Sequence, residues 1–249
     1  EMQIKGNTIL VAGGTSGIGR ALAARLHDAG NKVIVAGRRR DLLDEITAAH
    51  PGIESEVLDV TDAGSIQQLR DAVTAKHPDL NVLVTMAGIM VSERIADPGA
   101  LEVAERTIAT NLLGTIRLVH AFTPALTMRP EAAILTVTSG LAYVPLPITP
   151  TYNATKAAVH SYTESLREQL RDTSVQVIEI VPPLTRTDLM GNGTNNDRAM
   201  PLEEFVSEVM SLLESQPDAR QILVERVKRQ RYAEANGAYD QVFAMQAAR

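Results

Sequence analysis

Cysteine is absent from this sequence of 249 residues. The chain therefore forms no disulfide, has no thiolate nucleophile and builds none of the zinc sites that contain cysteine. Its histidines do not pair at the i, i+4 spacing of metal ligands on a helix; they are His27, His50, His77, His120 and His160. We expect no metal site.

An excess of positive charge and a long hydrophobic run are missing as well. The formal net charge is −6, so we expect no basic surface that would neutralise the phosphates of a nucleic acid. The longest nearly apolar run covers residues 82–91, whereas a membrane-spanning helix needs about 20 apolar residues. No charged segment followed by an apolar one opens the chain, as it would in a signal peptide. These absences predict a cytoplasmic protein that binds neither nucleic acid nor membrane.

Short apolar runs that alternate with helical patterns are what the sequence does contain. Such alternation is typical of βαβ units around a parallel sheet. Hydrophobic residues make up 45% of the chain, and its length suits one domain. We therefore expect a single α/β domain over residues 1–249, with a doubly wound parallel sheet of six or seven strands. The expected strands are 8–12, 33–36, 57–60, 82–86, 133–137, 175–181 and 222–224.

A glycine-rich stretch, AGGTSGIG at 12–19, follows the first expected strand and leads into an amphipathic helix that Gly30 can end. Gly13, Gly17 and Gly19 let the backbone turn tightly and approach a pyrophosphate, and the N-terminus of the helix attracts its charge. A strand-to-helix turn alone would also use glycines. The position after the first strand favours a dinucleotide site.

Basic residues follow the second expected strand, where an NAD-selective fold is expected to carry an acidic residue for the ribose 2′-hydroxyl. Arg38, with Thr15 or Ser16 and with Arg39, is able to hold the 2′-phosphate of NADP through charge-assisted hydrogen bonds. The alternative is a solvated basic turn capped by Asp41. We expect NADP(H) as the cofactor.

Asp59 and Val60 come at the end of the third expected strand. A carboxylate at that edge of the sheet can reach the adenine amino group of the dinucleotide. Alternatively, Asp59 only accepts a hydrogen bond from a local backbone N–H in the turn before the next helix.

Tyr152 and Lys156 stand one helical turn apart in the segment YNATK. Residues i and i+4 share a face of a helix, so the lysine can stabilise a tyrosinate, whose ordinary pKa is about 10, and tune it for proton transfer. Ser139 is expected at the carboxyl edge of the fifth strand, where α/β proteins bind ligands. Asn111 is expected in mid-helix, which is unfavourable unless its amide has a specific partner.

The glycine loop, Asn111, Ser139, Tyr152 and Lys156 resemble, in type, order and spacing, the motifs of the short-chain dehydrogenase/reductase (SDR) family, over essentially the whole chain. The resemblance implies a Rossmann-type fold and an NADP(H)-dependent oxidoreductase that interconverts a carbonyl and a secondary alcohol. Tyr152 would be the acid in reduction and the base in oxidation, and Ser139 would bind the substrate oxygen. Lys156 would bind the nicotinamide ribose, and Asn111 would hold a water that relays protons.

The resemblance also divides the chain into a dinucleotide-binding half, 1–90, and a catalytic and substrate-binding half, 100–249. The cofactor residues that it implies, besides Tyr152 and Lys156, are Gly13, Thr15, Ser16, Gly17, Ile18, Gly19, Arg38, Arg39, Asp59, Val60, Ala87, Gly88, Pro182, Leu184 and Thr187.

Three motifs depart from the family pattern. The chain has Thr85 and Met86 where Asn-Asn is common, Ala12 in place of a threonine, and two prolines from Pro182 in place of Pro-Gly. Met86 cannot supply the hydrogen bonds of an asparagine amide. This change affects the geometry of the loop more than the chemistry.

Apolar residues dominate the two stretches that we expect to enclose the substrate. One is 140–151, and the other follows Thr187 within the segment 186–200, which we predict to be mobile. They favour a neutral, partly hydrophobic small molecule, although Arg186 could bind an anionic group and core packing could account for many apolar positions. The expected substrate contacts are Leu141, Tyr143, Val144, Leu146, Leu189 and Met190, with Met90 as a further candidate.

Small residues follow one side of the helix after Tyr152. They permit close approach of another helix, and the family is often dimeric or tetrameric through this helix, so we expect a homodimer or homotetramer. The alternative is tight packing within one subunit. These residues are Ala154, Ala158, Ser161 and Ser165.

Two other functions use parts of the same pattern. A non-catalytic NADP sensor or scaffold would keep the fold, but binding alone requires neither Ser139 nor the hydroxyl of Tyr152. An epimerase or dehydratase of nucleotide sugars shares the tyrosine and lysine pair but ordinarily has an added substrate domain, for which the sequence after Ile222 is short.

Overall fold

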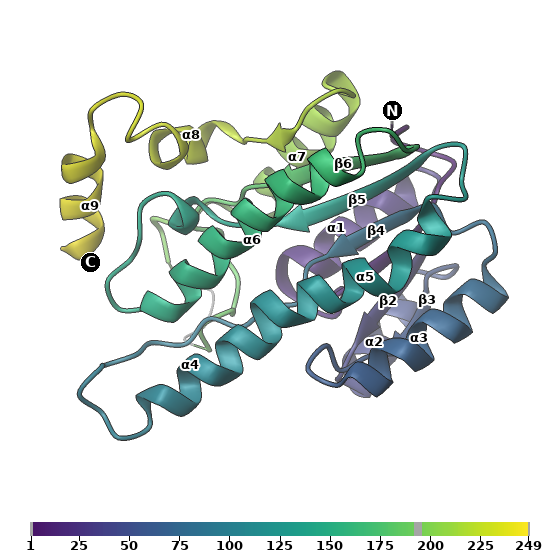
Figure 1. The fold of residues 1–249 in the computed structure, drawn as a ribbon, viewed down its shortest axis with the longest axis horizontal. Helices are drawn as coiled ribbons and strands as arrows, with labels where there is room; N and C mark the ends of the chain where they lie inside the picture. Colours follow the sequence, from purple (N-terminus) through teal and green to yellow (C-terminus); the bar gives the residue numbers. More distant parts are fainter. Residues whose placement is uncertain (1, 192–195, 249) are drawn as a thin grey trace.

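One parallel sheet organises the structure, a computed structural model that describes residues 2–191 and 196–248. In these residues the sheet has seven strands in the order β3-β2-β1-β4-β5-β6-β7, with helices on both faces (Figure 1). This confirms the doubly wound fold. The strands are β1 Thr8–Ala12, β2 Lys32–Gly37, β3 Glu54–Val57, β4 Val82–Thr85, β5 Ala132–Val137, β6 Val175–Ile180 and β7 Gln221–Ile222.

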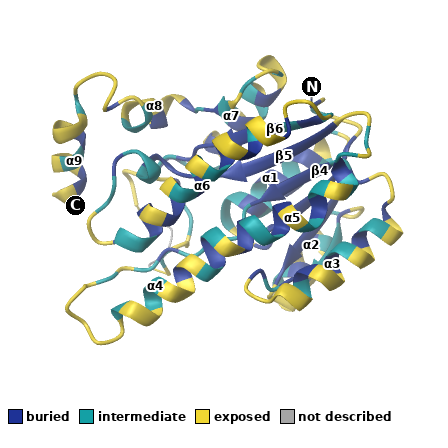
Figure 2. Ribbon diagram, in the orientation of Figure 1, coloured by how far each residue is buried: buried dark blue, intermediate teal, exposed yellow. Residues whose placement is uncertain are grey.

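Two apolar layers, one on each face of the sheet, form the core. Along β1, Ile9 and Val11 belong to one layer and Leu10 and Ala12 to the other, as expected for a strand that is covered on both faces. Figure 2 shows the buried strands between helices whose outer faces are exposed. The helices are α1 Gly17–Asp28, α2 Arg40–Ala49, α3 Ala63–Lys76, α4 Ala100–Ile108, η1 Ala109–Leu113, α5 Gly114–Leu126, η2 Gly140–Ala142, α6 Pro150–Gln169, α7 Leu202–Ser215, α8 Glu225–Arg231 and α9 Tyr239–Ala247.

The third strand lies earlier than predicted, at Glu54–Val57 instead of 57–60. It is an edge strand with polar residues, and Val57 is 46% exposed, so its apolar signal is weak. Leu58 N still donates to Gly37 O, and the chain then turns. Asp59 and Val60 therefore belong to the turn before α3 and not to a strand.

Backbone hydrogen bonds join the two ends of the stretch that was predicted to be mobile. Arg186 N donates to Met200 O at 2.8 Å, and Met200 N donates to Leu184 O at 2.9 Å. Residues 192–195, on which part of that prediction falls, lie outside the described residues.

The last helices pack against the segment that follows β5. Val144 forms a small apolar cluster with Ala233 and Val242, and Gln246 Nε2 donates to Val144 O at 3.0 Å. In the part of the chain that the structure describes, no helix has both the length and the apolar character to cross a membrane.

Candidate active site

Glycines at the carboxyl end of β1 allow two loops to pack in direct contact. Gly13 has φ +98°, and a Cβ there would overlap the backbone of Ala87. A Cβ on Gly19 would overlap the carbonyl of Gly13. Only glycine fits at both positions, so the loop can turn from β1 into α1 beside the end of β4.

The N-terminus of α1 fits a bound anion. Its N-cap, Ser16, makes no side-chain capping bond, and the first turn contains no acidic residue, so its N–H groups are available to a phosphate. Arg39 Nη2 donates to Ser16 Oγ at 2.9 Å, and Arg38 is exposed at the end of β2. The structure thus places two arginines near the site where a dinucleotide would lie.

Asp59 accepts the local hydrogen bond that the sequence analysis gave as the alternative to a contact with adenine. Its Oδ1 accepts hydrogen bonds from Thr61 N at 2.9 Å and Thr61 Oγ1 at 2.7 Å. The bond from the Thr61 hydroxyl, together with the charge of Arg38, holds the pKa of Asp59 below its ordinary value. The carboxylate therefore stays ionised near Arg38.

Ser139 and Tyr152 meet where β5 ends. Ser139 caps η2, with Leu141 N donating to its Oγ at 3.1 Å. Tyr152, on the first turn of α6, is only 7% exposed. Burial raises the pKa of Tyr152 to about 12, while its hydrogen bond with Ser139 lowers it.

Lys156 lies beside the tyrosine ring, with Nζ 5.6 Å from the ring centroid, and Nζ donates to Val137 O at 2.8 Å. Burial lowers the pKa of Lys156 to about 8. The sequence predicted that the lysine depresses the pKa of Tyr152. In this structure burial dominates instead and the tyrosine pKa is raised, because both groups lie in a desolvated interior.

Asn111 has a specific partner, as its mid-helix position required. Its Oδ1 accepts from Ile89 N at 2.8 Å and its Nδ2 donates to Ile89 O at 2.9 Å. The helix is not regular here, because 109–113 form a π-turn between α4 and α5, a feature frequent at functional sites. A Cβ on Gly88 would lie 3.4 Å from Asn111 Oδ1 and 3.9 Å from Lys156 Nζ. Ile89 and Gly88 thus bring the β4 loop against two of the predicted catalytic residues.

A cleft of about 660 Å³ lies beside the loop after β4, and Ile89, which Asn111 holds, is among its lining residues. Asn111, Ser139, Tyr152 and Lys156 do not line the described part of this cleft. Leu189, Met190 and Met90, which are predicted substrate contacts, line this cleft together with Arg38. The sequence analysis missed several of its residues. Thr110 directly precedes Asn111, and Arg106 is one turn before Thr110 on the same helical face. Both could have been predicted by following the helix back from Asn111. The other lining residues are Ile89, Val91, Ser92, Asp188 and Gly191.

One predicted substrate contact is wrong in this structure, because Val144 is 0% exposed beneath the last helices. The hydroxyl of Tyr143 donates to Glu179 on β6. The Tyr143 side chain is partly exposed but does not line the described part of the cleft. Leu141 and Leu146 are partly exposed but do not line the described part of the cleft.

The remaining predicted cofactor residues lie between β6 and the cleft. Pro182 is buried and its carbonyl accepts from Gly140 N at 2.9 Å, and Leu184 is exposed. Thr187 lies beside the glycine loop, where a Cβ on Gly17 would be 3.5 Å from it.

A glycine-rich strand-to-helix turn beside a serine, tyrosine and lysine cluster is typical of an oxidoreductase. The family model for short chain dehydrogenases matches residues 7–198. The chain belongs to the short-chain dehydrogenase/reductase family.

Two curated proteins illustrate the relationship. The chain is 40% identical over 248 residues to the uncharacterized oxidoreductase DltE of Bacillus subtilis (strain 168), with 97% of each chain covered. It is 32% identical over 195 residues to sulfoacetaldehyde reductase 2 of Chromohalobacter salexigens, with 77% of each covered.

Solved structures share the fold. A short chain dehydrogenase from Burkholderia cenocepacia J2315 in complex with NADP has a TM-score of 0.83 at 25% identity, covering 98% of this chain and 99% of that one. A family member from Burkholderia phymatum in complex with NAD has a TM-score of 0.79 at 19% identity, covering 95% of both.

Replacing Lys156 with methionine is expected to stabilise the folded protein at pH 7. Because burial lowers the pKa of Lys156 to about 8, the charged amine opposes folding by up to about 3 kcal/mol. Above pH 8, and up to the ordinary lysine pKa of 10.5, the unfolded chain binds more protons than the folded one. The wild type therefore gains stability relative to the variant as pH rises through this window.

Urea unfolding of both proteins at pH 7 and at pH 10 measures this difference. The exposed Lys5, replaced in the same way, is the control for the removal of one positive charge. A stability difference between wild type and Lys156→Met that is equal at the two pH values would contradict the buried, desolvated lysine.

Proposed function

We propose that the protein is an NADP(H)-dependent oxidoreductase that interconverts a carbonyl compound and a secondary alcohol. The observation that carries this proposal is the meeting of Ser139, Tyr152 and Lys156 at the carboxyl end of β5, beside the glycine cradle. In the same proposal, residues 1–90 mainly hold the dinucleotide and residues 100–249 supply catalysis and substrate binding.

In reduction, the Tyr152 hydroxyl donates its proton to the substrate oxygen, and the Ser139 hydroxyl donates a hydrogen bond to the same oxygen. A bound nicotinamide supplies the hydride. Lys156, close to the tyrosine ring, binds the nicotinamide ribose and restores the proton of Tyr152. The side-chain amide of Asn111 holds the β4 loop through Ile89. The water relay that we expected at Asn111 stays a prediction.

NADP(H) rather than NAD(H) is proposed because cationic residues stand where the 2′-phosphate would lie. Arg38 and Arg39 follow β2, and Arg39 already contacts Ser16 on the phosphate-binding turn. Asp59 follows β3 and not β2, so it does not stand where an NAD-selective fold carries its acidic residue for the ribose. Related structures contain NADP in one case and NAD in another, so the choice depends on these residues.

A neutral, partly hydrophobic ketone or alcohol is the proposed substrate, because Met90, Leu189 and Met190 line the cleft. A small anionic aldehyde or ketone is the second candidate. Arg106 on the cleft favours it, as does the likeness to a sulfoacetaldehyde reductase.

The test is the oxidation of NADPH, followed optically, against a panel of aromatic ketones, aliphatic ketones and small anionic carbonyl compounds, with NADH in parallel. Turnover of neutral ketones with NADPH supports the first candidate. Turnover of only the anionic compounds favours the second. Tight NADPH binding without any turnover favours a sensor or scaffold, and a preference for NADH contradicts the role of Arg38.

The protein is proposed to form a homodimer or homotetramer through α6, where Ala154, Ser161 and Ser165 are exposed along the helix. Light scattering is expected to give two or four times the chain mass of 26.9 kDa. Ser161→Glu should shift the protein toward monomer, because it places charge in a close helix contact. A monomeric wild type at assay concentration would show that the small residues serve only packing within the subunit.

The cytoplasmic location of the protein also stays a prediction.

A further inference from the structure

The carboxylate of Glu179 is buried next to the candidate active site and takes no part in the proposed proton transfer. Glu179, on β6, is 0% exposed. Burial acts to raise its pKa, but hydrogen bonds from His160, Thr138 and Gln221 hold the pKa of Glu179 below its ordinary value. The side chain therefore stays ionised and can only accept hydrogen bonds.

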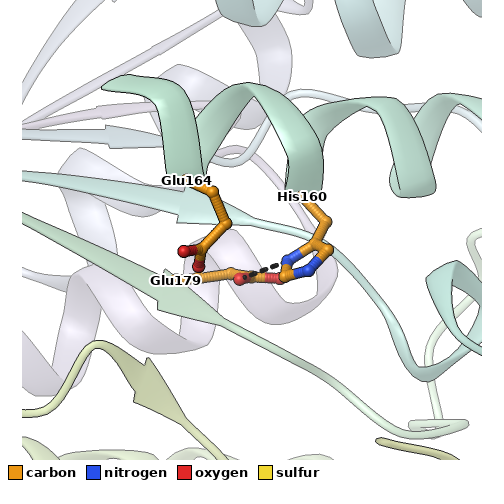
Figure 3. A group of neighbouring side chains, drawn as sticks. All are labelled: His160, Glu164 and Glu179. Carbon is orange, nitrogen blue, oxygen red and sulfur yellow. Dashed lines mark hydrogen bonds and ion pairs between the residues drawn. The ribbon is translucent and has the colours of Figure 1, made fainter. Parts of the chain in front are cut away.

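Donors from four segments converge on this carboxylate. Thr138 Oγ1 donates to Oε1 at 2.6 Å, and the Tyr143 hydroxyl donates to the same atom at 3.2 Å. Gln221 Nε2 and His160 Nδ1 each lie 2.8 Å from Oε2. Figure 3 shows His160 on its helix and Glu179 on the strand, joined by this contact. Because the carboxylate only accepts, His160 carries its proton on Nδ1.

The two donors to Oε1 stand on either side of Ser139 in the chain. Thr138 directly precedes Ser139, and Tyr143 ends the short turn η2 that Ser139 caps. Burial raises the pKa of Tyr143 well above its ordinary value, so the phenol remains a donor. Oε1 of Glu179 thus accepts hydrogen bonds from residues on both sides of Ser139, at the two ends of the turn that carries it.

The same carboxylate reaches the helix that carries the other catalytic residues. His160 is one turn after Lys156 on α6, and residues at this spacing share a face. On the other side, Gln221 Nε2 also donates to the Tyr143 hydroxyl at 2.7 Å. Arg231 Nε donates to Gln221 Oε1 at 2.8 Å, and its guanidinium lies 4.7 Å from the centroid of the Tyr143 ring.

We propose that Glu179 is a positioning residue, which holds the Ser139 turn against α6 so that the hydroxyls of Ser139 and Tyr152 address the same substrate oxygen. This inference rests on the proposed function and extends it to a residue on the far side of the site. Its mechanism is geometric, since small displacements of catalytic groups cost large factors in rate.

A bound cation is the alternative for this cluster, because His160, Glu164 and Glu179 place one ligand atom each within 4.8 Å of one another. Both oxygens of Glu179 are already engaged, however, and Glu164 Oε1 pairs with Arg167 Nη1 at 2.6 Å. A cation would have to displace these bonds. The contacts therefore favour positioning over metal binding.

Two variants of Glu179 test the hydrogen bonds that its oxygens accept. Glu179→Leu fills a similar volume without an acceptor, and kcat is expected to fall about 10- to 100-fold while the KM for NADPH changes little. Glu179→Gln keeps an acceptor oxygen for Thr138 and Tyr143 but places an NH2 group against His160 and Gln221, so kcat is expected to fall less than in Glu179→Leu. Ile178→Val, at the neighbouring buried position of β6, is the control for lost packing and should keep the wild-type kcat.

Hydrogen exchange supplies a readout that needs no turnover. Amides of 139–144 are expected to exchange faster in Glu179→Leu than in Ile178→Val, with the segment 8–28 unchanged. This outcome is expected even if the wild type reduces none of the carbonyl panel, so failure of the proposed function remains distinguishable. If the leucine variant does not fold, Tyr143→Phe removes one donor to Oε1 and should produce the same two changes to a smaller extent.

Three results would overturn the proposal. The first is unchanged kcat and unchanged exchange in Glu179→Leu. The second is a loss in Glu179→Gln as large as in the leucine variant, which would show that the hydrogen bonds from Thr138 and Tyr143 do not hold the turn. The third is a rise in melting temperature with added Zn²⁺ that Glu164→Gln abolishes, which would make the cluster a metal site.

Discussion

Replacing Tyr152 with phenylalanine is expected to lower kcat for carbonyl reduction by about 100- to 10,000-fold, the range over which general acid catalysis contributes. The ring fills the same buried space beside Lys156, so folding and NADPH affinity should change little. The loss should appear in kcat and not in KM, because the hydroxyl acts on the substrate oxygen in the transition state. NADPH oxidation under saturating substrate measures it.

Tyr162→Phe is the matched control. Tyr162 lies on the same helix but packs against the apolar layer that contains Leu10 and Ala12. It should keep the wild-type kcat. A Tyr152→Phe enzyme that retains kcat within a few-fold would remove the tyrosine from the proton transfer. Unaltered NADPH binding in a wild type that reduces no substrate would instead favour the sensor.

Replacing Arg38 with alanine is expected to raise the KM for NADPH about 10- to 100-fold, while kinetics with NADH stay nearly constant. A hydrogen bond to a charged group is worth about 1.5 to 3 kcal/mol, and about 1.4 kcal/mol corresponds to a factor of ten. Only NADPH carries the 2′-phosphate, so the effect falls on one cofactor. The ratio of kcat/KM for the two cofactors is the decisive quantity.

Arg40→Ala, at the first residue of α2 and also exposed, is the control for loss of one positive charge on the same turn. It should leave the cofactor ratio within a few-fold of the wild type. Arg38 also lies close enough to Asp59 to lower the pKa of that carboxyl. If pairing with Asp59 is its only role, Arg38→Ala will lower stability without changing the cofactor ratio.

Local patterns predicted the elements that carry strong apolar signals. Strands β1, β2, β4, β5 and β6 were placed to within about two residues, because each is a buried run covered on both faces. The edge strand β3 was misplaced, since three of its four residues are polar and none of the four is buried. Its pairing with Ile34–Gly37 of β2 is a contact between distant segments, which no local window contains.

The candidate site was predictable in part for a similar reason. Tyr152 and Lys156 are one turn apart, and Ser139 follows a strand, so their convergence follows from helix and sheet geometry. Tyr143 shows the limit of this reasoning. An apolar stretch suggested a pocket wall, but the phenol turns inward because Glu179, 36 residues later, offers it a buried acceptor.

The sequence by itself determined the fold class, the glycine-rich turn after β1 and the types of group that meet at the end of β5, because periodicity and motif spacing are properties of short segments. Tertiary structure alone decided how those groups are solvated, and hence that burial lowers the pKa of Lys156 and raises that of Tyr152. It also decided that Glu179 joins β5, α6 and β7. Desolvation and long-range hydrogen bonds depend on which distant segments pack together, and only the folded chain brings those segments into contact.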